Sequence, residues 1–437
     1  MFLGVSCLKR AGLVLTTLAL ASLGFLSCGY SGSGYKKPGS GLDTRVLVSQ
    51  SVSSPTALAG LLILNAAKDT YARASELNGG NSPGMMTLSP TRATLLAFDS
   101  GTNTVQVVDT RTETNIGKVQ LPGPTTSIVI PVTTRIGYAA VPTAANNLFT
   151  SPGGIVVMNI GSGGTTTTIG VPKAQTVVSN PNGTQLLVFS SDSDFVSVVS
   201  PGLAVPPVDQ GCDTAPNTVC TIVPGFDRPV FAIWNGNTAY VLNCGAECGG
   251  TQASVQVLDT ATMTPGPPLP VDGATFAFLK GTTLYVAGTS PVNNACTGQK
   301  TAATICGRLS IVDLGSMTVT ASVVITDGYH DRMDMSSNGR LFIGARTCTN
   351  IGNINNPSGE VRGCLSIFDT MVPGNTTAAV PSDNGDVTGL QSFTSYNKEY
   401  VTEGGNLRIY DTTKNTLQKH QIAIVGDAVD VKAIDFF

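Results

Sequence analysis

Few side chains in this sequence are suited to acid–base chemistry. Only two of its 437 residues are histidines, His330 and His420, and a hydrolase of the Ser-His-Asp type needs a histidine to accept the proton of its nucleophile. We expect His420 in a solvent-facing outer strand. His330 lies in the segment GYHDR, residues 328–332, where ionisable neighbours could hold its pKa near neutrality. Two roles stay open for His330: a turn residue bonded to Asp331, or a residue that contacts a ligand.

Motifs for cofactors and metals are weak. Quinone-dependent dehydrogenases typically stack a tryptophan on the cofactor, but Trp234 is the single tryptophan here, and we expect it to pack between structural repeats. The chain has no Cys-x-x-Cys-His motif for covalent haem, and the GSGG run at residues 161–164 favours a turn over a phosphate loop. Asp192 and Asp194 could bind calcium, although two acids at a hairpin tip are usually just solvated. We expect neither a metal nor a cofactor.

Apart from Cys7 and Cys28, the cysteines fall into four local pairs. The pairs are Cys212/Cys220, Cys244/Cys248, Cys296/Cys306 and Cys348/Cys364. In an oxidising compartment such pairs form disulfides, so we expect four, each closing a local loop. A thiolate metal site shared by neighbouring segments is the alternative, but no pair has the two-residue spacing of zinc knuckles.

The N-terminal segment predicts export. Lys9 and Arg10 precede an apolar, charge-free run from residue 11 to residue 26, which is the order of a secretory signal peptide. The run ends in Leu26-Ser27-Cys28, which resembles the lipobox of bacterial lipoproteins and implies that the thiol of Cys28 is acylated. Phe25 departs from that pattern, because the position three before the cysteine is usually leucine.

These features divide the chain into three parts. We expect a lipoprotein signal peptide over residues 1–27, a flexible tether over residues 28–44 and one folded domain over residues 45–437. The resemblance implies a protein anchored by lipid to a bacterial membrane, in the cell envelope, facing the periplasm or the exterior. Plain secretion and an uncleaved anchor are the alternatives, and the choice between inner and outer membrane stays open.

The composition of the chain predicts an all-β fold. Charged residues make up 12% of the sequence and the net charge is −3, which argues against a nucleic-acid binder. Hydrophobic residues, at 41%, are enough for a large core. The 49 glycines and 25 prolines are too many turn-formers for a helical protein.

A short apolar strand that ends in Asp-Thr, or in a close variant, recurs along the chain. Five clear copies end at Asp109, Asp259, Asp313, Asp369 and Asp411, and weaker copies end at Asn65, Asn159 and Ser200. Such side chains can accept a hydrogen bond from the backbone two residues on, so each copy should end a strand by starting a turn. Each copy follows one apolar strand and precedes a polar outer strand and a further apolar strand. The repeating unit is therefore four strands.

The number of units predicts a propeller. Eight units over residues 45–437 give about 49 residues each, in the range of a four-stranded propeller blade. The region opens with second and third strands, at residues 45–50 and 61–64, and ends with a first strand at residues 428–434. The C-terminal strand should therefore pair with the N-terminal strands and leave no open edge. We expect a single β-propeller of eight four-stranded antiparallel blades, with seven blades as the alternative.

The repeated phrases resemble the YVTN-type β-propeller repeat family. The resemblance lies in strand phrases such as VQVLDT at residues 255–260 and Ala239-Tyr240-Val241, and in Ser-Pro-Asp-Gly-like turns at residues 180–183 and 337–339. It covers nearly all of residues 45–437. Members commonly have seven blades, so a count of eight departs from the family.

Strand direction predicts which loops share a surface. In an antiparallel blade, the connection into the first strand and the connection between the second and third strands emerge on one side, which we name the upper face. This face should carry long stapled insertions at residues 289–307 and 346–364, where binding residues concentrate. Charged residues near the channel could hold an anionic group there: Lys173, Arg228, His330, Asp331, Arg332 and Arg346. The alternative is that the insertions only cap the blades.

Two classes of function stay open. The first is a non-catalytic, envelope-anchored propeller that binds a protein, a glycan or a small ligand on the upper face. The second is an enzyme such as a sugar-lactone hydrolase, a chemistry carried by some related propellers, and the shortage of histidine argues against it. Metal ligands that converge near the channel axis would distinguish the two classes.

Overall fold

The computed structural model separates the chain into two units, Met1–Lys37 and Pro38–Phe437. It describes residues 38–51, 60–131, 135–146, 149–161, 164, 166–200, 210–212, 219–289, 291, 305–349, 364–379, 385–418, 422–424 and 426–435. The expected signal peptide, Cys28, most of the expected tether, and His420 lie outside these residues. Within them, no helix is long and apolar enough to cross a membrane.

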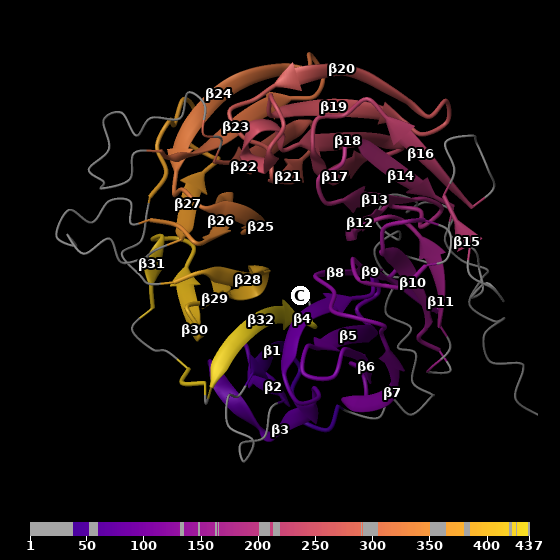
Figure 1. The fold of residues 1–437 in the computed structure, drawn as a ribbon. Helices are drawn as coiled ribbons and strands as arrows, with labels where there is room; N and C mark the ends of the chain where they lie inside the picture. The colour runs from indigo at the N-terminus through magenta and orange to yellow at the C-terminus, as the bar shows by residue number, and fades with distance from the viewer. Residues whose placement is uncertain are drawn as a thin grey trace, which may run out of the picture. The chain divides into compact units, whose positions relative to one another are not determined.

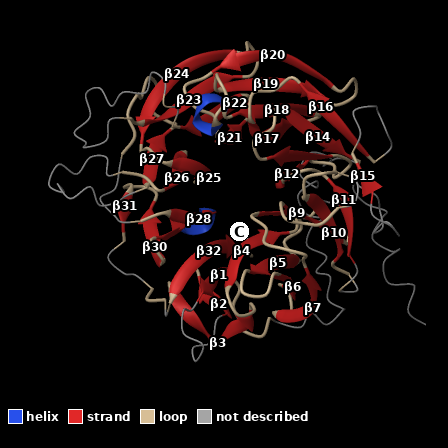
Figure 2. Cartoon of the chain, viewed as in Figure 1, coloured by secondary structure: helices blue, strands red, loops and turns tan. Residues whose placement is uncertain are grey.

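The described strands form eight sheets, arranged as the blades of a ring around a central channel (Figure 1). Figure 2 shows that strands make up nearly all of the regular structure. The helical elements of the described part are two short 3₁₀ turns, η1 (Gly245–Cys248) and η2 (Thr394–Tyr396). The predicted eight-bladed, antiparallel β-propeller is confirmed, and the seven-bladed alternative is excluded.

Each blade runs from an inner strand beside the channel to an outer strand. The first blade contains β32 (Asp427–Ala433), β1 (Arg45–Ser51), β2 (Gly60–Asn65) and β3 (Thr70–Asn78). The second contains β4 (Pro83–Leu88), β5 (Thr94–Asp99), β6 (Thr104–Asp109) and β7 (Thr114–Gln120). The third contains β8 (Ser127–Val129), β9 (Ile136–Val141), β10 (Gly154–Asn159) and β11 (Thr166–Gly170). The fourth contains β12 (Ala174–Ser179), β13 (Leu186–Ser190), β14 (Phe195–Val199) and β16 (Cys220–Pro224).

The remaining blades continue in the same order. The fifth contains β17 (Pro229–Asn235), β18 (Thr238–Asn243), β19 (Ser254–Asp259) and β20 (Thr264–Pro270). The sixth contains β21 (Phe276–Lys280), β22 (Thr283–Gly288), β23 (Gly307–Asp313) and β24 (Thr318–Ile325). The seventh contains β25 (Tyr329–Met335), β26 (Arg340–Arg346) and β27 (Leu365–Asp369). The eighth contains β28 (Val387–Phe393), β29 (Lys398–Glu403), β30 (Asn406–Asp411) and β31 (Thr416–Leu417).

Two blades differ from the regular four-stranded unit. In the third blade a fifth strand, β15 (Gln210–Gly211), pairs parallel to β11 at the outer edge. In the seventh blade the described outer position holds a single antiparallel bridge between Ile367 and Ala379. The chain therefore varies the outer edge of a blade while it keeps the three inner strands.

The turn after the third strand forms as the sequence predicts. A side-chain oxygen accepts a hydrogen bond from the backbone N–H two residues on, over 2.8–3.3 Å, in Asn65, Asp109, Asn159, Asp259, Asp313, Asp369 and Asp411. In one of these turns, the amides of Thr262 and Ala261 hold the pKa of Asp259 below its ordinary value. Ser200, the weaker copy in the fourth blade, is followed by residues outside the described part.

Consecutive residues of a second strand are buried because both faces of a blade are covered by neighbouring blades. In β5, Leu95, Leu96 and Ala97 are fully buried. Leu95 packs in one core cluster with Leu61 of the first blade, whereas Leu96 packs in another with Ala139 of the third blade. This two-sided burial accounts for the unbroken apolar runs of the repeat. In a sheet buried on one face only, apolar and polar residues would alternate along the strand.

The ring closes through the two ends of the chain. β32 pairs antiparallel with β1, with Val46 opposite Ala433 and Val48 opposite Val431. The predicted closure, in which the C-terminal strand completes the blade begun by the N-terminal strands, is confirmed. Arg45 adds a buried ion-pair cluster at this joint, because NH1 lies 2.9 Å from Glu113 of the second blade and NH2 lies 2.8 Å from Asp435.

Side chains join the inner strands of neighbouring blades, which belong to separate sheets. At four places a side chain of one inner strand accepts a hydrogen bond from a backbone N–H of the next, over 2.6–3.2 Å: Ser127 with Val177, Asp334 with Ser392, Gln391 with Ala433, and Asp430 with Met86. These bonds satisfy backbone groups that would otherwise lie unpaired at the channel.

Three of the four expected disulfides are present with the predicted pairing: Cys212–Cys220, Cys244–Cys248 and Cys348–Cys364. Cys306 is disulfide-bonded, and its expected partner, Cys296, lies outside the described residues. Cys212 directly follows β15 of the third blade, and Cys220 is the first residue of β16 in the fourth blade. A bond that is local in sequence therefore links two neighbouring blades.

The Arg45 cluster predicts a large effect on stability. Arg45→Gln would leave the Glu113 and Asp435 carboxylates close together without their guanidinium group, and breaking a buried ion pair in this way costs about 3–5 kcal/mol. Arg111→Gln is the matched control, because Arg111 is 62% exposed in its pair with Asp109 and should cost less than about 1 kcal/mol. Urea unfolding monitored by circular dichroism measures both. Equal losses in the two variants would show that the cluster does not stabilise the closure.

Candidate functional site

The strand registers bring the predicted site residues to one end of the channel. β12 begins opposite the end of β13, with Ala174 beside Ser190, and β25 begins opposite the end of β26, with Tyr329 beside Arg346. β17 begins in the same way, opposite the end of β18. The starts of the first strands and the ends of the second strands therefore share the upper face.

A cavity of about 720 Å³ lies at this end of the channel. Its wall comes from five consecutive inner strands, β8, β12, β17, β21 and β25, together with the ends of β13 and β26. Figure 1 shows these strands on successive blades around the channel. The volume is within the range of about 300–1,000 Å³ that small-molecule sites occupy. One ligand in this cavity could contact several blades.

The seventh blade contributes most of the charge in the cavity wall. Nε of Arg346 lies 2.9 Å, and NH1 of Arg332 lies 3.6 Å, from Oδ2 of Asp331. Arg332 also donates from Nε to the carbonyl oxygen of Thr388 over 3.0 Å, which fixes its guanidinium group. Burial raises the pKa of Asp331 above its ordinary value, and the positive charges of the two arginines oppose that shift.

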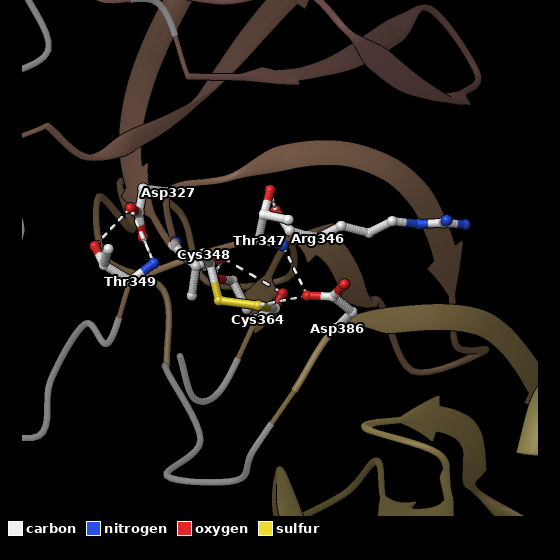
Figure 3. The surroundings of a disulfide bond; sticks show 9 residues. Asp327, Arg346, Thr347, Cys348, Thr349, Cys364 and Asp386 are labelled. Atoms are coloured by element: carbon white, nitrogen blue, oxygen red, sulfur yellow. Dashed lines mark hydrogen bonds between the residues drawn. A yellow bond between two sulfur atoms is a disulfide. The ribbon is translucent and has the colours of Figure 1, made fainter. Parts of the chain in front are cut away.

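The backbone next to Arg346 is firmly held. Cys348 and Cys364 form the disulfide that closes the insertion, and the Asp386 carboxylate accepts a hydrogen bond from the Thr347 N–H over 2.7 Å. In Figure 3 the Arg346 side chain extends away from the disulfide. This side chain is 40% exposed. The disulfide and Asp386 therefore position a guanidinium group whose charge a ligand can reach.

Arg228 brings a third guanidinium group to the cavity from the fifth blade. It precedes β17, its side chain is 26% exposed, and Nε lies 3.8 Å from Asp194. Lys173, by contrast, pairs with Asp192 over 3.5 Å, and both side chains are mostly exposed. Asp192 belongs to the cavity wall, whereas Lys173 does not. The structure therefore brings Arg228, but not Lys173, together with the residues of the seventh blade.

The rest of the wall is aromatic and hydroxyl-bearing. The rings of Phe231 and Phe276 stack with their centroids 4.5 Å apart, and Tyr329 is 41% exposed. The wall also contains seven neutral polar residues: Thr126, Ser127, Gln175, Thr176, Ser190, Ser191 and Thr275. The cavity therefore combines cationic groups, aromatic rings and neutral hydrogen-bonding groups.

His330 lies apart from the other predicted site residues. It lies within β25 rather than in a turn, its side chain is fully buried, and it is not part of the cavity wall. Burial lowers its pKa to about 4, so the imidazole is neutral at physiological pH. The register of β25 shifts between His330 and Arg332. Such a bulge re-aims the side chains around it, and it leaves Asp331 and Arg332 in the wall.

Several residues of the wall were not among the predicted site residues. Phe231, Phe276 and Tyr329 belong to first strands, where apolar residues are expected to pack in the core. β17 also carries a register shift, between Pro229 and Phe231. Alternation along a strand does not reveal such bulges, so the sequence carried no signal for these aromatic rings.

Glu247 is a further ionisable group at the edge of this region. It lies in η1, the turn closed by the Cys244–Cys248 disulfide, and Cys248 belongs to the cavity wall. Its carboxylate accepts a hydrogen bond from the Thr289 N–H over 2.7 Å. Burial nevertheless raises its pKa to about 7. Glu247 therefore changes charge within the physiological pH range.

Comparison with known proteins supports the fold. No family model matches the chain, and no curated protein sequence matches it. Among solved structures, dihydro-heme d1 dehydrogenase NirN in complex with DHE has a TM-score of 0.59 at 10% identity, over 92% of this chain and 77% of that chain. The Dos1 propeller has a TM-score of 0.56 at 7% identity, over 79% and 85%. Hydrazine synthase of Kuenenia stuttgartiensis has a TM-score of 0.50 at 15% identity, over 78% and 96%.

These similarities place the chain among β-propellers. At such low identities they show the fold alone, and neither binding nor catalysis follows from them. Membership of the YVTN-type repeat family stays a prediction.

The raised pKa of Glu247 predicts a pH-dependent stability. Between its ordinary value of 4.5 and the folded value of about 7, the folded protein binds more protons than the unfolded chain. Stability should therefore fall as the pH rises from 5 to 8. Glu247→Gln should remove roughly 1–3 kcal/mol of that fall, measured as denaturant midpoints at both pH values. Asp192→Asn, at an exposed carboxylate of the wall, serves as the control. An unchanged pH dependence in Glu247→Gln would contradict the assignment.

Proposed function

We propose that this chain is a non-catalytic binding propeller whose ligand places an anionic group in the upper-face cavity. One observation carries the proposal. Three arginines from two blades, Arg228, Arg332 and Arg346, line the same cavity, whose wall contains two carboxylates, Asp192 and Asp331. Positive charge therefore exceeds negative charge in the wall by three to two, although the whole chain has a net charge of −3.

The shape, partial burial and fixed position of the three arginines also suit an anion. A guanidinium group is always charged and offers donors in a planar fork that matches a carboxylate or a phosphate. The side chains of Arg228, Arg332 and Arg346 are only 26%, 29% and 40% exposed. Partial removal from water strengthens their attraction for an anion, because less solvent screens the charge. Strands and a disulfide hold them, so little ordering is needed on binding.

We also propose that the protein is anchored to a bacterial envelope membrane through acylated Cys28. The support is the N-terminal sequence, in which an apolar run ends in Leu26-Ser27-Cys28. The first described residues lie on the face opposite the upper face, which we name the lower face. There the hydroxyl group of Ser40 donates a hydrogen bond to Glu113 over 2.6 Å, beside the turn that follows β6. The described part of the chain therefore begins on the face opposite the cavity.

The anchor has its own test. Cys28→Ala removes the thiol that would carry the acyl chains, and we expect the variant to stay unprocessed or to move into the soluble fraction. Two or more acyl chains are needed for stable anchoring, so the loss should be nearly complete. Fractionation of cells, with mass spectrometry of the mature N-terminus, measures both outcomes. A Cys28→Ala variant that is processed and still membrane-bound would exclude the lipoprotein assignment.

The anion site is tested with two probes of equal shape and different charge, benzoate and benzamide. We expect benzoate to bind the mature protein at least tenfold more tightly than benzamide by calorimetry at constant ionic strength, and Arg346→Gln to remove most of this difference. Arg111→Gln, at an exposed arginine on the lower face, is the matched control. Equal binding of the two probes, or equal effects of the two variants, would contradict the proposal.

The same protein samples test the enzymatic alternative. A sugar-lactone hydrolase would open D-glucono-1,5-lactone faster than buffer does, and we expect no such acceleration. Turnover above the buffer rate that Arg346→Gln abolishes would replace the binding proposal with a catalytic one.

A further inference from the structure

Four polar atoms of the cavity wall are buried without a hydrogen-bond partner among the described residues. They are Nε of Arg228, Nε of Arg346, Oδ1 of Asp331 and Oγ of Ser190. Nε of Arg346 lies 2.9 Å from Oδ2 of Asp331, but at an angle that makes no hydrogen bond. Buried polar groups are normally paired. The four atoms are closed to solvent in the free protein, so a ligand that completes them must displace the side chains that cover them.

These atoms define what the ligand must supply. The two arginine nitrogens are donors that face the Asp194 and Asp331 carboxylates in ion pairs without a hydrogen bond, so an acid oxygen of a ligand would complete them. Oδ1 of Asp331 is an acceptor when ionised, so it needs a hydroxyl or amine donor. A simple anion meets only the first need, and the Asp331 carboxylate would repel it. The ligand therefore carries an acid group and hydrogen-bond donors close to each other.

The hydroxyl groups and aromatic rings of the wall narrow the class of ligand further. Ser190 offers an unpaired hydroxyl group, and the wall has further neutral hydroxyl groups at Thr126, Thr176 and Ser191. Such groups suit a ligand with several hydroxyls of its own. The partly exposed Tyr329 and the stacked rings of Phe231 and Phe276 offer flat apolar surfaces in the wall. The C–H face of a pyranose ring packs well on such a surface.

We propose, on the basis of the anion site proposed above, that the cavity binds an acidic sugar, either a free hexuronate or the terminal hexuronate of a glycan. Its carboxylate lies against Arg346 and Arg228, and a ring hydroxyl donates to Oδ1 of Asp331. The pyranose ring rests on the aromatic part of the wall. A volume of about 720 Å³ accommodates more than one sugar unit.

The experiment compares four probes on the mature protein: D-glucuronate, D-glucose, benzoate and L-phenylalanine. Binding is measured by ligand-observed NMR and calorimetry at pH 7 and constant ionic strength. We expect D-glucuronate to bind at least tenfold more tightly than D-glucose and than benzoate. Arg346→Gln should weaken the binding of D-glucuronate roughly tenfold while changing the affinity for D-glucose little. Asp331→Ala should weaken both sugars while leaving benzoate unchanged or bound more tightly.

The control variant and the remaining outcomes decide between the acidic-sugar inference and its alternatives. Arg111→Gln should leave all four affinities unchanged, and a loss in this control would assign the effect to general charge. If benzoate binds as tightly as D-glucuronate and Arg346→Gln weakens both, the anion site stands and the sugar inference is wrong. If L-phenylalanine binds most tightly, Asp331 recognises an ammonium group and the inference is equally wrong. If no probe responds to Arg346→Gln, both the inference and the anion site fail.

Discussion

The pairing of β32 with β1 is the constraint on which the rest of the structure depends. It makes the last strand of the chain the inner strand of the first blade, so that eight separate sheets surround one channel in a closed ring. Each inner strand then presents a backbone edge to the channel. Side chains such as Asp334 and Asp430 accept hydrogen bonds from the next blade, which joins the edges into a ring. The cavity exists because this ring fixes five inner strands around one space.

The chemistry of the cavity follows from strand direction and from local irregularity. Because every blade has the same chain direction, residues that begin first strands and residues that end second strands gather on the upper face. Arg228 and Arg346 reach the cavity by these two routes. Register shifts at the start of β17 and β25 then re-aim neighbouring side chains. Partly enclosed guanidinium groups, an aspartate with an unpaired oxygen and aromatic rings come together as a result.

The sequence predicted the fold well because the fold is repetitive. Each turn after a third strand depends on one side chain, as at Asp109, so the blade count could be read from short phrases. Arg346 was predicted as a site residue because strand direction determines the face. The burial of His330 could not be predicted, since it depends on a β-bulge that the residue types in this segment do not indicate. Phe231 and Phe276 could not be separated from core residues, because an inner strand places similar apolar side chains both in the core and at the channel.

The central claim is that the upper-face cavity is the ligand site and that arginines from two blades hold an acid group there. A crystal structure of the mature protein soaked with D-glucuronate tests this claim most directly. Our account predicts sugar density inside the cavity, with the carboxylate in hydrogen-bond distance of Arg346 and a hydroxyl group beside Oδ1 of Asp331. Sugar density on the lower face or on the outer strands, with the cavity empty, would contradict it.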